Sequence, residues 1–162
     1  MKFENICSIG VPCPTLWDYL TDIPKVATCL PGVEEVNAPE EGKYTGVISL
    51  KVGAVKLRLS GKISVELMDK ETRSAIMAVE AVDQKISGMV RGKLTLRLDE
   101  QGPTQTKLTV GSDINLFGKI GEFGQPIIRK KADQMMDEFA NNLAANVGGN
   151  RITSPASIFN LG

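Results

Sequence analysis

The chain has 162 residues, with 19 basic and 19 acidic side chains and no histidine. A chain of this length can bury most of its apolar surface in one core, and the missing histidine removes the commonest general base and metal ligand of proteins. We therefore expect one compact domain, over residues 1–147, with no catalytic triad, metal site or cofactor. Residues 148–162 begin with two glycines and lack periodicity, which predicts a flexible tail.

The N-terminal part of the chain predicts one strand followed by two short helices. Apolar and polar side chains alternate over residues 2–11, as in a strand with one buried face. Pro14 suits the first turn of the first helix, and Asp22 is a suitable N-cap for the second, which ends at Leu30-Pro31-Gly32.

Residues 43–116 continue the two-residue alternation through several segments joined by short polar links. This pattern is typical of an antiparallel sheet with one dry face and one wet face. Glycines within the strands indicate bulges or bends, so the sheet should curve. The residues expected to face inward are Gly46, Ile48, Leu50, Val52, Leu57, Leu59, Ile63, Val65, Leu67, Val90, Leu94, Leu96, Leu98, Leu108, Val110, Ile114 and Leu116.

A single long amphipathic helix is predicted over residues 126–147, where apolar residues recur every three to four positions. At 1.5 Å per residue it would be roughly 33 Å long, about the width of a domain of this size. The expected fold is therefore α+β: a curved antiparallel sheet of about seven strands wrapped around one long C-terminal helix.

A curved sheet and a straight helix leave space between them unless bulky side chains fill it. The inward residues are mainly small and aliphatic, so we expect a hollow that an apolar ligand could occupy. The alternative is that the phenylalanines and methionines fill the gap. The predicted ligand-binding wall consists of Leu20, Leu30, Met77, Val79, Val90, Leu94, Val110, Phe117, Phe123, Ile127, Met135 and Phe139.

Few residues offer catalytic chemistry. Glu80, Asp113 and Arg91 could act as acids or bases if buried, but the alternation places both carboxylates toward solvent. Cys29 has no histidine to activate it, and the three cysteines form no CxxC pair, which fits reduced thiols. The glycines between Gly118 and Gly124 lack the spacing of a phosphate-binding loop and suit the entrance of a pocket instead. We assign no catalytic residue.

Several short motifs in a fixed order resemble the CoxG family of carbon monoxide dehydrogenase subunits. They are Pro14-x-x-Trp17-x-x-Leu20-x-Asp22, Cys29-Leu30-Pro31-Gly32-Val33, Tyr44-x-Gly46 with Lys51-Val52-Gly53, and Leu116-x-Gly118-Lys119-x-Gly121-x-x-Gly124 ahead of Phe139-x-x-x-Leu143. The resemblance covers about residues 1–147. It implies the helix-grip fold of the START-like (SRPBCC) superfamily and a hydrophobic pocket between sheet and helix. It also implies a role beside a molybdenum-containing CO dehydrogenase or related hydroxylase, in membrane recruitment or quinone handling.

These observations lead to a non-catalytic binding protein for a quinone or lipid. One alternative is a cyclase or hydrolase that uses the same cavity. Another is a structural adaptor that docks on the hydroxylase through a basic sheet face, since residues 43–107 hold twelve basic and seven acidic side chains. Lacking a long apolar run and a signal sequence, the chain is expected to be cytoplasmic, with membrane contact limited to the inner surface. Nucleic-acid binding is not expected, because aromatic residues are few.

Overall fold

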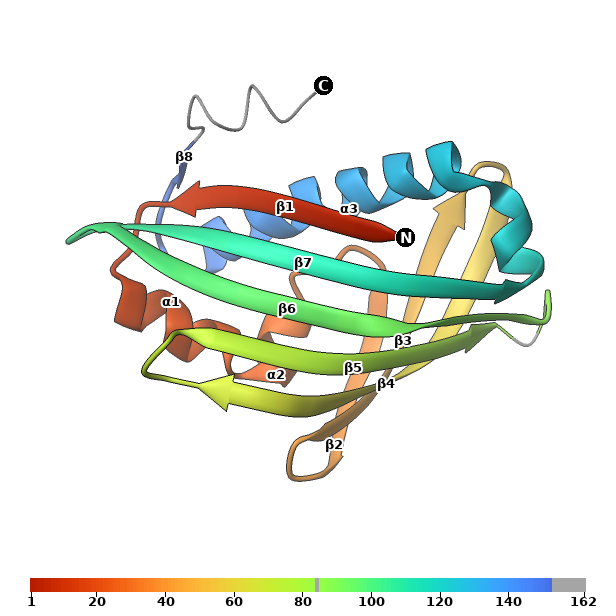
Figure 1. Ribbon diagram of the computed structural model, residues 1–162, viewed down its shortest axis with the longest axis horizontal. Coiled ribbons are helices and arrows are strands. Elements are labelled where there is room, and N and C mark those ends of the chain that lie inside the picture. Colours follow the sequence, from red (N-terminus) through yellow and green to blue (C-terminus); the bar gives the residue numbers. More distant parts are fainter. Residues whose placement is uncertain (84, 153–162) are drawn as a thin grey trace.

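The computed structural model describes residues 1–83 and 85–152. One antiparallel sheet covers a long helix and two short ones, which lie together on one side of the sheet (Figure 1). The strands follow the spatial order β2-β3-β4-β5-β6-β7-β1-β8. The strands are β1 (Lys2–Ile9), β2 (Val33–Glu40), β3 (Lys43–Val52), β4 (Val55–Asp69), β5 (Ser74–Asp83), β6 (Gly88–Gly102), β7 (Gln105–Gly118) and β8 (Arg151–Ile152). The helices are α1 (Cys13–Leu20), α2 (Ile23–Ala27), the 3₁₀ helix η1 (Lys119–Phe123) and α3 (Gln125–Asn146).

The helices begin where the local sequence predicts. Pro14 lies in the first turn of α1, where its missing N–H costs no hydrogen bond. The Asp22 carboxylate caps α2 by accepting a hydrogen bond from the Lys25 backbone N–H at 3.3 Å. The predicted pair of short helices after the first strand is therefore confirmed.

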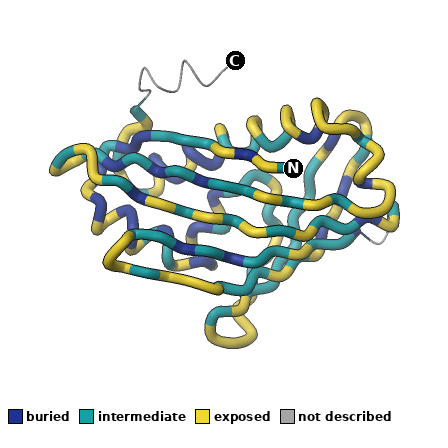
Figure 2. The backbone as a smooth tube through the Cα atoms, in the orientation of Figure 1, coloured by how far each residue is buried: buried dark blue, intermediate teal, exposed yellow. Residues whose placement is uncertain are grey.

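The two-residue alternation is clearest along β6 and β7 in Figure 2, where more buried and less buried positions follow one another. One predicted inward residue, Leu67, is nevertheless 44% exposed. A register shift lies between Val65 and Leu67: Val65 pairs with Met77, whereas Leu67 pairs with Ile76. The expectation for Leu67 is wrong because this β-bulge adds a residue and reverses which face the following side chains occupy.

The core consists of two clusters of buried side chains. The first packs α1, α2 and the C-terminal half of α3 against β1, β6 and β7, and contains Phe139 and Leu143. The second contains Ile128, near the start of α3, with Leu57 and Leu59 of β4. Because Ile128 and Phe139 are three turns apart on α3, the middle of the helix lies between the two clusters.

The chain beyond α3 returns to the sheet edge. Arg151 and Ile152 form β8 against Ile9 and Ser8 of β1, and the Arg151 guanidinium pairs with the Asp137 carboxylate at 2.6 Å. This short strand falls within the predicted flexible tail, of which residues 153–162 lie outside the described residues. Over the described ranges, none of the helices has the length and apolar character that crossing a bilayer requires.

Candidate functional site

A cavity of about 370 Å³ lies between the sheet and α3, and we call it the main cavity. This volume is within the range of roughly 300–1,000 Å³ found for small-molecule sites. The sheet contributes most of its wall through β3 and β4, and α2 and the first half of α3 close it from the other side. Prominent members of the wall are Ile23, Leu30, Tyr44, Ile48, Leu50, Leu57, Leu59, Ile63, Ile128 and Met135.

The cavity exists because small residues lie next to one another across the sheet. Gly46, Gly61 and Ala81 are paired in β3, β4 and β5, and all three line the main cavity. Their side chains are at most a methyl group, so the sheet surface recedes from the helix at this level. At Gly46 a Cβ would lie 2.7 Å from the Glu35 carbonyl oxygen, so the close approach of β2 requires glycine there. On the helix side Ala132 also leaves room.

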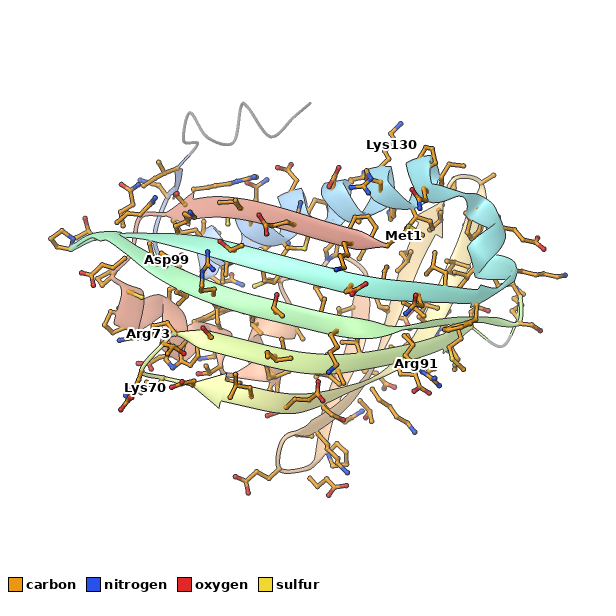
Figure 3. All side chains as sticks on the ribbon, in the orientation of Figure 1. Met1, Lys70, Arg73, Arg91, Asp99 and Lys130 are labelled. Carbon is orange, nitrogen blue, oxygen red and sulfur yellow. The ribbon has the colours of Figure 1, made fainter. Side chains whose placement is uncertain are left out.

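The wall is almost entirely apolar. Of its charged residues, Glu35, Lys62 and Glu80 are exposed, and Lys131 is half-buried. The Glu80 carboxylate lies 3.5 Å from the Arg91 guanidinium on the outer face of the sheet, and Figure 3 shows Arg91 on the side turned away from the helices. Among the described residues, the charged side chains of the wall are thus exposed or half-buried, and its buried part is apolar.

Five of the twelve predicted wall residues line the main cavity: Leu30, Val79, Val90, Leu94 and Met135. Four others belong to the first core cluster instead, namely Leu20, Met77, Val110 and Phe139. Met77 and Val79 face the same side of β5, but two residues advance a strand by about 7 Å, which separates filled core from cavity. Whether any of these residues contacts a ligand remains a prediction.

The last three predicted wall residues lie away from the main cavity. Phe117 is 47% exposed because it alternates with Leu116, which faces inward and lines the main cavity together with Ile114 of the same strand. Ile127 is 45% exposed and lies beside the buried Ile128, about 100° around the helix. Phe123 is half-buried against the second core cluster.

The residues that the prediction missed are chiefly those of β3 and β4. Alternation had already placed Ile48, Leu50, Leu57 and Leu59 inward, so a signal existed. It did not reveal which part of the inner face lies over the hollow. Ile23 and Ala27 of α2 were missed because no local pattern shows where a short helix packs.

Cys29 occupies a structural position. Its thiol lies 3.6 Å from the Tyr19 hydroxyl, and the Asn146 side-chain amide donates to the sulfur at 3.3 Å. The neighbouring Asn142 amide donates to the Cys29 carbonyl at 2.9 Å. These contacts attach the loop after α2 to the C-terminal end of α3. Burial also raises the pKa of Tyr19, and its contact with Cys29 adds to this rise.

The other thiols are unsuited to nucleophilic attack. Burial raises the pKa of Cys7 to about 11 and also raises the pKa of Cys13. Both therefore stay protonated at neutral pH, and the thiolate is the reactive form.

Solved structures with similar folds span nearly the whole chain. A conserved protein from Geobacillus kaustophilus has a TM-score of 0.83 and 17% identity, covering 94% of this chain and 100% of its own. The Zhui aromatase/cyclase from Streptomyces sp. R1128 has a TM-score of 0.64 and 15% identity, with coverage of 91% and 93%. A START superfamily protein from Mycobacterium smegmatis has a TM-score of 0.66 and 11% identity, with coverage of 91% and 97%. At these identities the likeness establishes the fold, which is the helix-grip fold of START-like proteins.

Sequence comparison finds a match to a protein family. Residues 7–148 match CoxG, a family of carbon monoxide dehydrogenase subunits. A comparison with curated proteins finds no match.

Proposed function

Because the chain belongs to the CoxG family of carbon monoxide dehydrogenase subunits, we propose that it binds a hydrophobic small molecule, a quinone or another lipid, without transforming it. The observation that carries this proposal is the main cavity, a hollow of about 370 Å³ whose wall is almost entirely apolar. Transfer of an apolar molecule from water into such a cavity is favourable, whereas a polar molecule would lose its hydrogen bonds to water.

The size of the site suggests modest affinity. Burying about 300 Å² of apolar ligand surface at ~25 cal/mol per Å² contributes about 7 kcal/mol before the costs of association. Micromolar or weaker binding follows, which suits a carrier that must also release its ligand.

The partner and location form a second part of the proposal. We infer that the protein works beside a molybdenum-containing CO dehydrogenase or related hydroxylase, in membrane recruitment or quinone handling. Such a role places it in the cytoplasm, with transient contact at the inner face of the membrane. The family assignment supports this part.

Native mass spectrometry of the freshly purified protein tests the binding function. We expect a fraction of the protein to carry a bound mass that solvent extraction identifies as a quinone or lipid. Titration of the ligand-free protein with a decyl-substituted benzoquinone should give saturable binding at micromolar concentrations. A protein that carries no ligand and binds neither the quinone nor a chain-matched lipid would refute the proposed function.

The alternative is a structural adaptor that docks on the hydroxylase, and one observation favours it. A second hollow, of about 590 Å³, lies on the outer side of β3 and β4. Its charged lining residues are Lys51, Lys56, Arg58, Lys85 and Asp83. Reversing the charge of Lys56 and Lys85 should abolish binding to a hydroxylase if this surface docks it, and should leave quinone binding unchanged. The cyclase or hydrolase alternative has only the shared fold in its favour, because Glu80 and Asp113 are exposed.

A further inference from the structure

A small polar hollow adjoins the main cavity, and we call it the outer hollow. It has a volume of about 190 Å³ and lies where the Pro31-Gly32 corner and β3 meet α3. It shares three lining residues with the main cavity: Leu50, Lys131 and Met135. These three side chains therefore lie at the boundary between an apolar space and a polar one.

The outer hollow carries positive charge. Its charged residues are Lys51, Lys131 and Glu138, accompanied by the polar side chains of Ser49 and Gln134. Six ion pairs form among residues 1–83 and 85–152, and neither lysine takes part in any of them. Lys51 is exposed and also lines the hollow on the outer side of β3 and β4, so Lys131 is the lysine that the outer hollow shares with the main cavity.

Lys131 is the residue that joins the two environments. It is half-buried and lines both spaces, whereas the preceding Lys130 is exposed. Figure 3 shows the Lys130 side chain pointing away from the sheet. A lysine in the position of Lys131 lays its methylene stem along apolar surface and keeps its ammonium group at the polar end.

The apolar main cavity and the polar outer hollow favour one orientation of a ligand that has a polar head group. A polar head group inside the main cavity would lose its hydrogen bonds to water and find no replacement in the apolar wall. The same head group in the outer hollow would receive hydrogen bonds from an ammonium group, which are stronger than those between neutral groups.

We propose that the ligand is an amphiphile that binds with its apolar part in the main cavity and its head group in the outer hollow. The head group presents an acceptor oxygen, either a quinone carbonyl or a carboxylate, to the Lys131 ammonium group. Lys131 is then the residue that discriminates head groups. This inference rests on the proposed function, since it specifies the ligand class for the same site.

Lys131→Met tests the inference, with Lys130→Met as the matched control. Methionine keeps much of the side-chain volume and forms helices well, so both variants should fold, and thermal unfolding checks this. Three probes with a ten-carbon chain are titrated calorimetrically into the full chain: decanoate, a decyl-substituted benzoquinone and decylbenzene, which has no acceptor oxygen. Lys131→Arg, which keeps the charge, serves as the rescue variant.

We expect Lys131→Met to weaken the binding of a probe with an acceptor head group about tenfold relative to the unmodified protein and Lys130→Met. Binding of decylbenzene should be unchanged in Lys131→Met, and Lys131→Arg should restore most of the lost affinity. If only decanoate loses affinity, the natural head group is a carboxylate; if the benzoquinone loses affinity as well, a carbonyl suffices.

If each probe binds Lys131→Met as tightly as it binds Lys130→Met, the inference is overturned. The proposed function would remain intact. Failure of all three probes to bind the unmodified protein would instead refute the proposed function.

Discussion

Asp83 is buried at the end of β5, where its carboxylate accepts hydrogen bonds from three backbone N–H groups. The donors are Arg58 at 2.9 Å, Lys85 at 2.8 Å and Ile86 at 3.2 Å. The first of these holds β4 where it extends past β5, and the other two shape the turn toward β6. The hydrogen bonds, led by that from Arg58, lower the pKa of Asp83 below its usual value.

We expect Asp83→Asn to lower the free energy of unfolding by about 1–3 kcal/mol at pH 7, because an amide cannot accept all three hydrogen bonds with equal strength. A carboxylate with a depressed pKa stabilises the fold above its unfolded pKa of about 3.9, and this stabilisation is lost as the pH falls through the lower folded value. The difference between the two proteins in urea unfolding should therefore shrink toward zero in acid. Asp113→Asn, at an exposed site in β7, should change stability little at any pH. An undiminished difference below pH 3 would contradict this account.

Substitutions of Gly61 test whether the small residues of the sheet create the main cavity. A Cβ there would meet only ordinary contacts, at 3.5 Å from the Glu80 carbonyl oxygen and 3.6 Å from the Ala81 Cβ. Gly61→Leu should therefore fold, fill part of the main cavity and raise the free energy of unfolding by about 1 kcal/mol. Binding of the decyl-substituted benzoquinone should weaken at least tenfold, whereas Gly61→Ala should bind nearly as the unmodified protein does. Retained quinone binding in a folded Gly61→Leu protein would place the ligand elsewhere.

At the scale of elements, α3 is attached to the rest of the fold at its C-terminal end. The Asn142 amide donates to the carbonyl of Cys29, which follows α2. This contact fixes α2 beside the main cavity, to which α2 contributes Ile23 and Ala27.

Asn142→Ala should cost about 1 kcal/mol of stability, the usual net contribution of one hydrogen bond. Because α2 would be held less firmly, hydrogen exchange of its amides should accelerate more than exchange in β6. Lys130→Ala, at an exposed position of the same helix, is the control and should leave both measurements unchanged. Uniform acceleration across the whole chain would show that Asn142 stabilises the fold globally and not α2 in particular.

At the scale of the whole molecule, the main cavity takes much of its wall from the second core cluster, including Leu57, Leu59 and Ile128. The first cluster packs the C-terminal half of α3 against the sheet and so fixes the helix next to the hollow. A ligand would add the contacts that the empty space lacks.

A ligand that binds only the folded chain should raise the melting temperature with the logarithm of its concentration once it exceeds the dissociation constant. At one hundred times the dissociation constant the stabilisation is about 2.7 kcal/mol. For a chain of this length we expect a rise of roughly 5–10 °C in a thermal-shift measurement with the decyl-substituted benzoquinone. In Gly61→Leu, where binding is at least tenfold weaker, the stabilisation at the same ligand concentration should be about 1.4 kcal/mol or less, so the rise should be about half as large or smaller. An equal shift in both proteins would indicate binding outside the main cavity.

Much of the architecture could be predicted because it follows from local patterns. The two-residue alternation over residues 43–116 identifies the strands and their inner face, and the three-to-four spacing over residues 126–147 identifies the long helix. Together these patterns restrict the chain to a sheet on one helix. The motifs from Pro14 to Leu143 point to the family independently of any coordinates.

The outline of the main cavity was decided by tertiary structure alone. Alternation states that Met77 and Val79 face inward, but not that one meets filled core and the other empty space. That difference depends on the pairing of Gly46, Gly61 and Ala81 across three strands, and on where α2 and Lys131 come to lie. Sequence by itself therefore determined the elements and their inner face, since these depend on neighbours along the chain. Only the folded molecule decided where the hollow lies, because a cavity is formed by residues far apart in sequence.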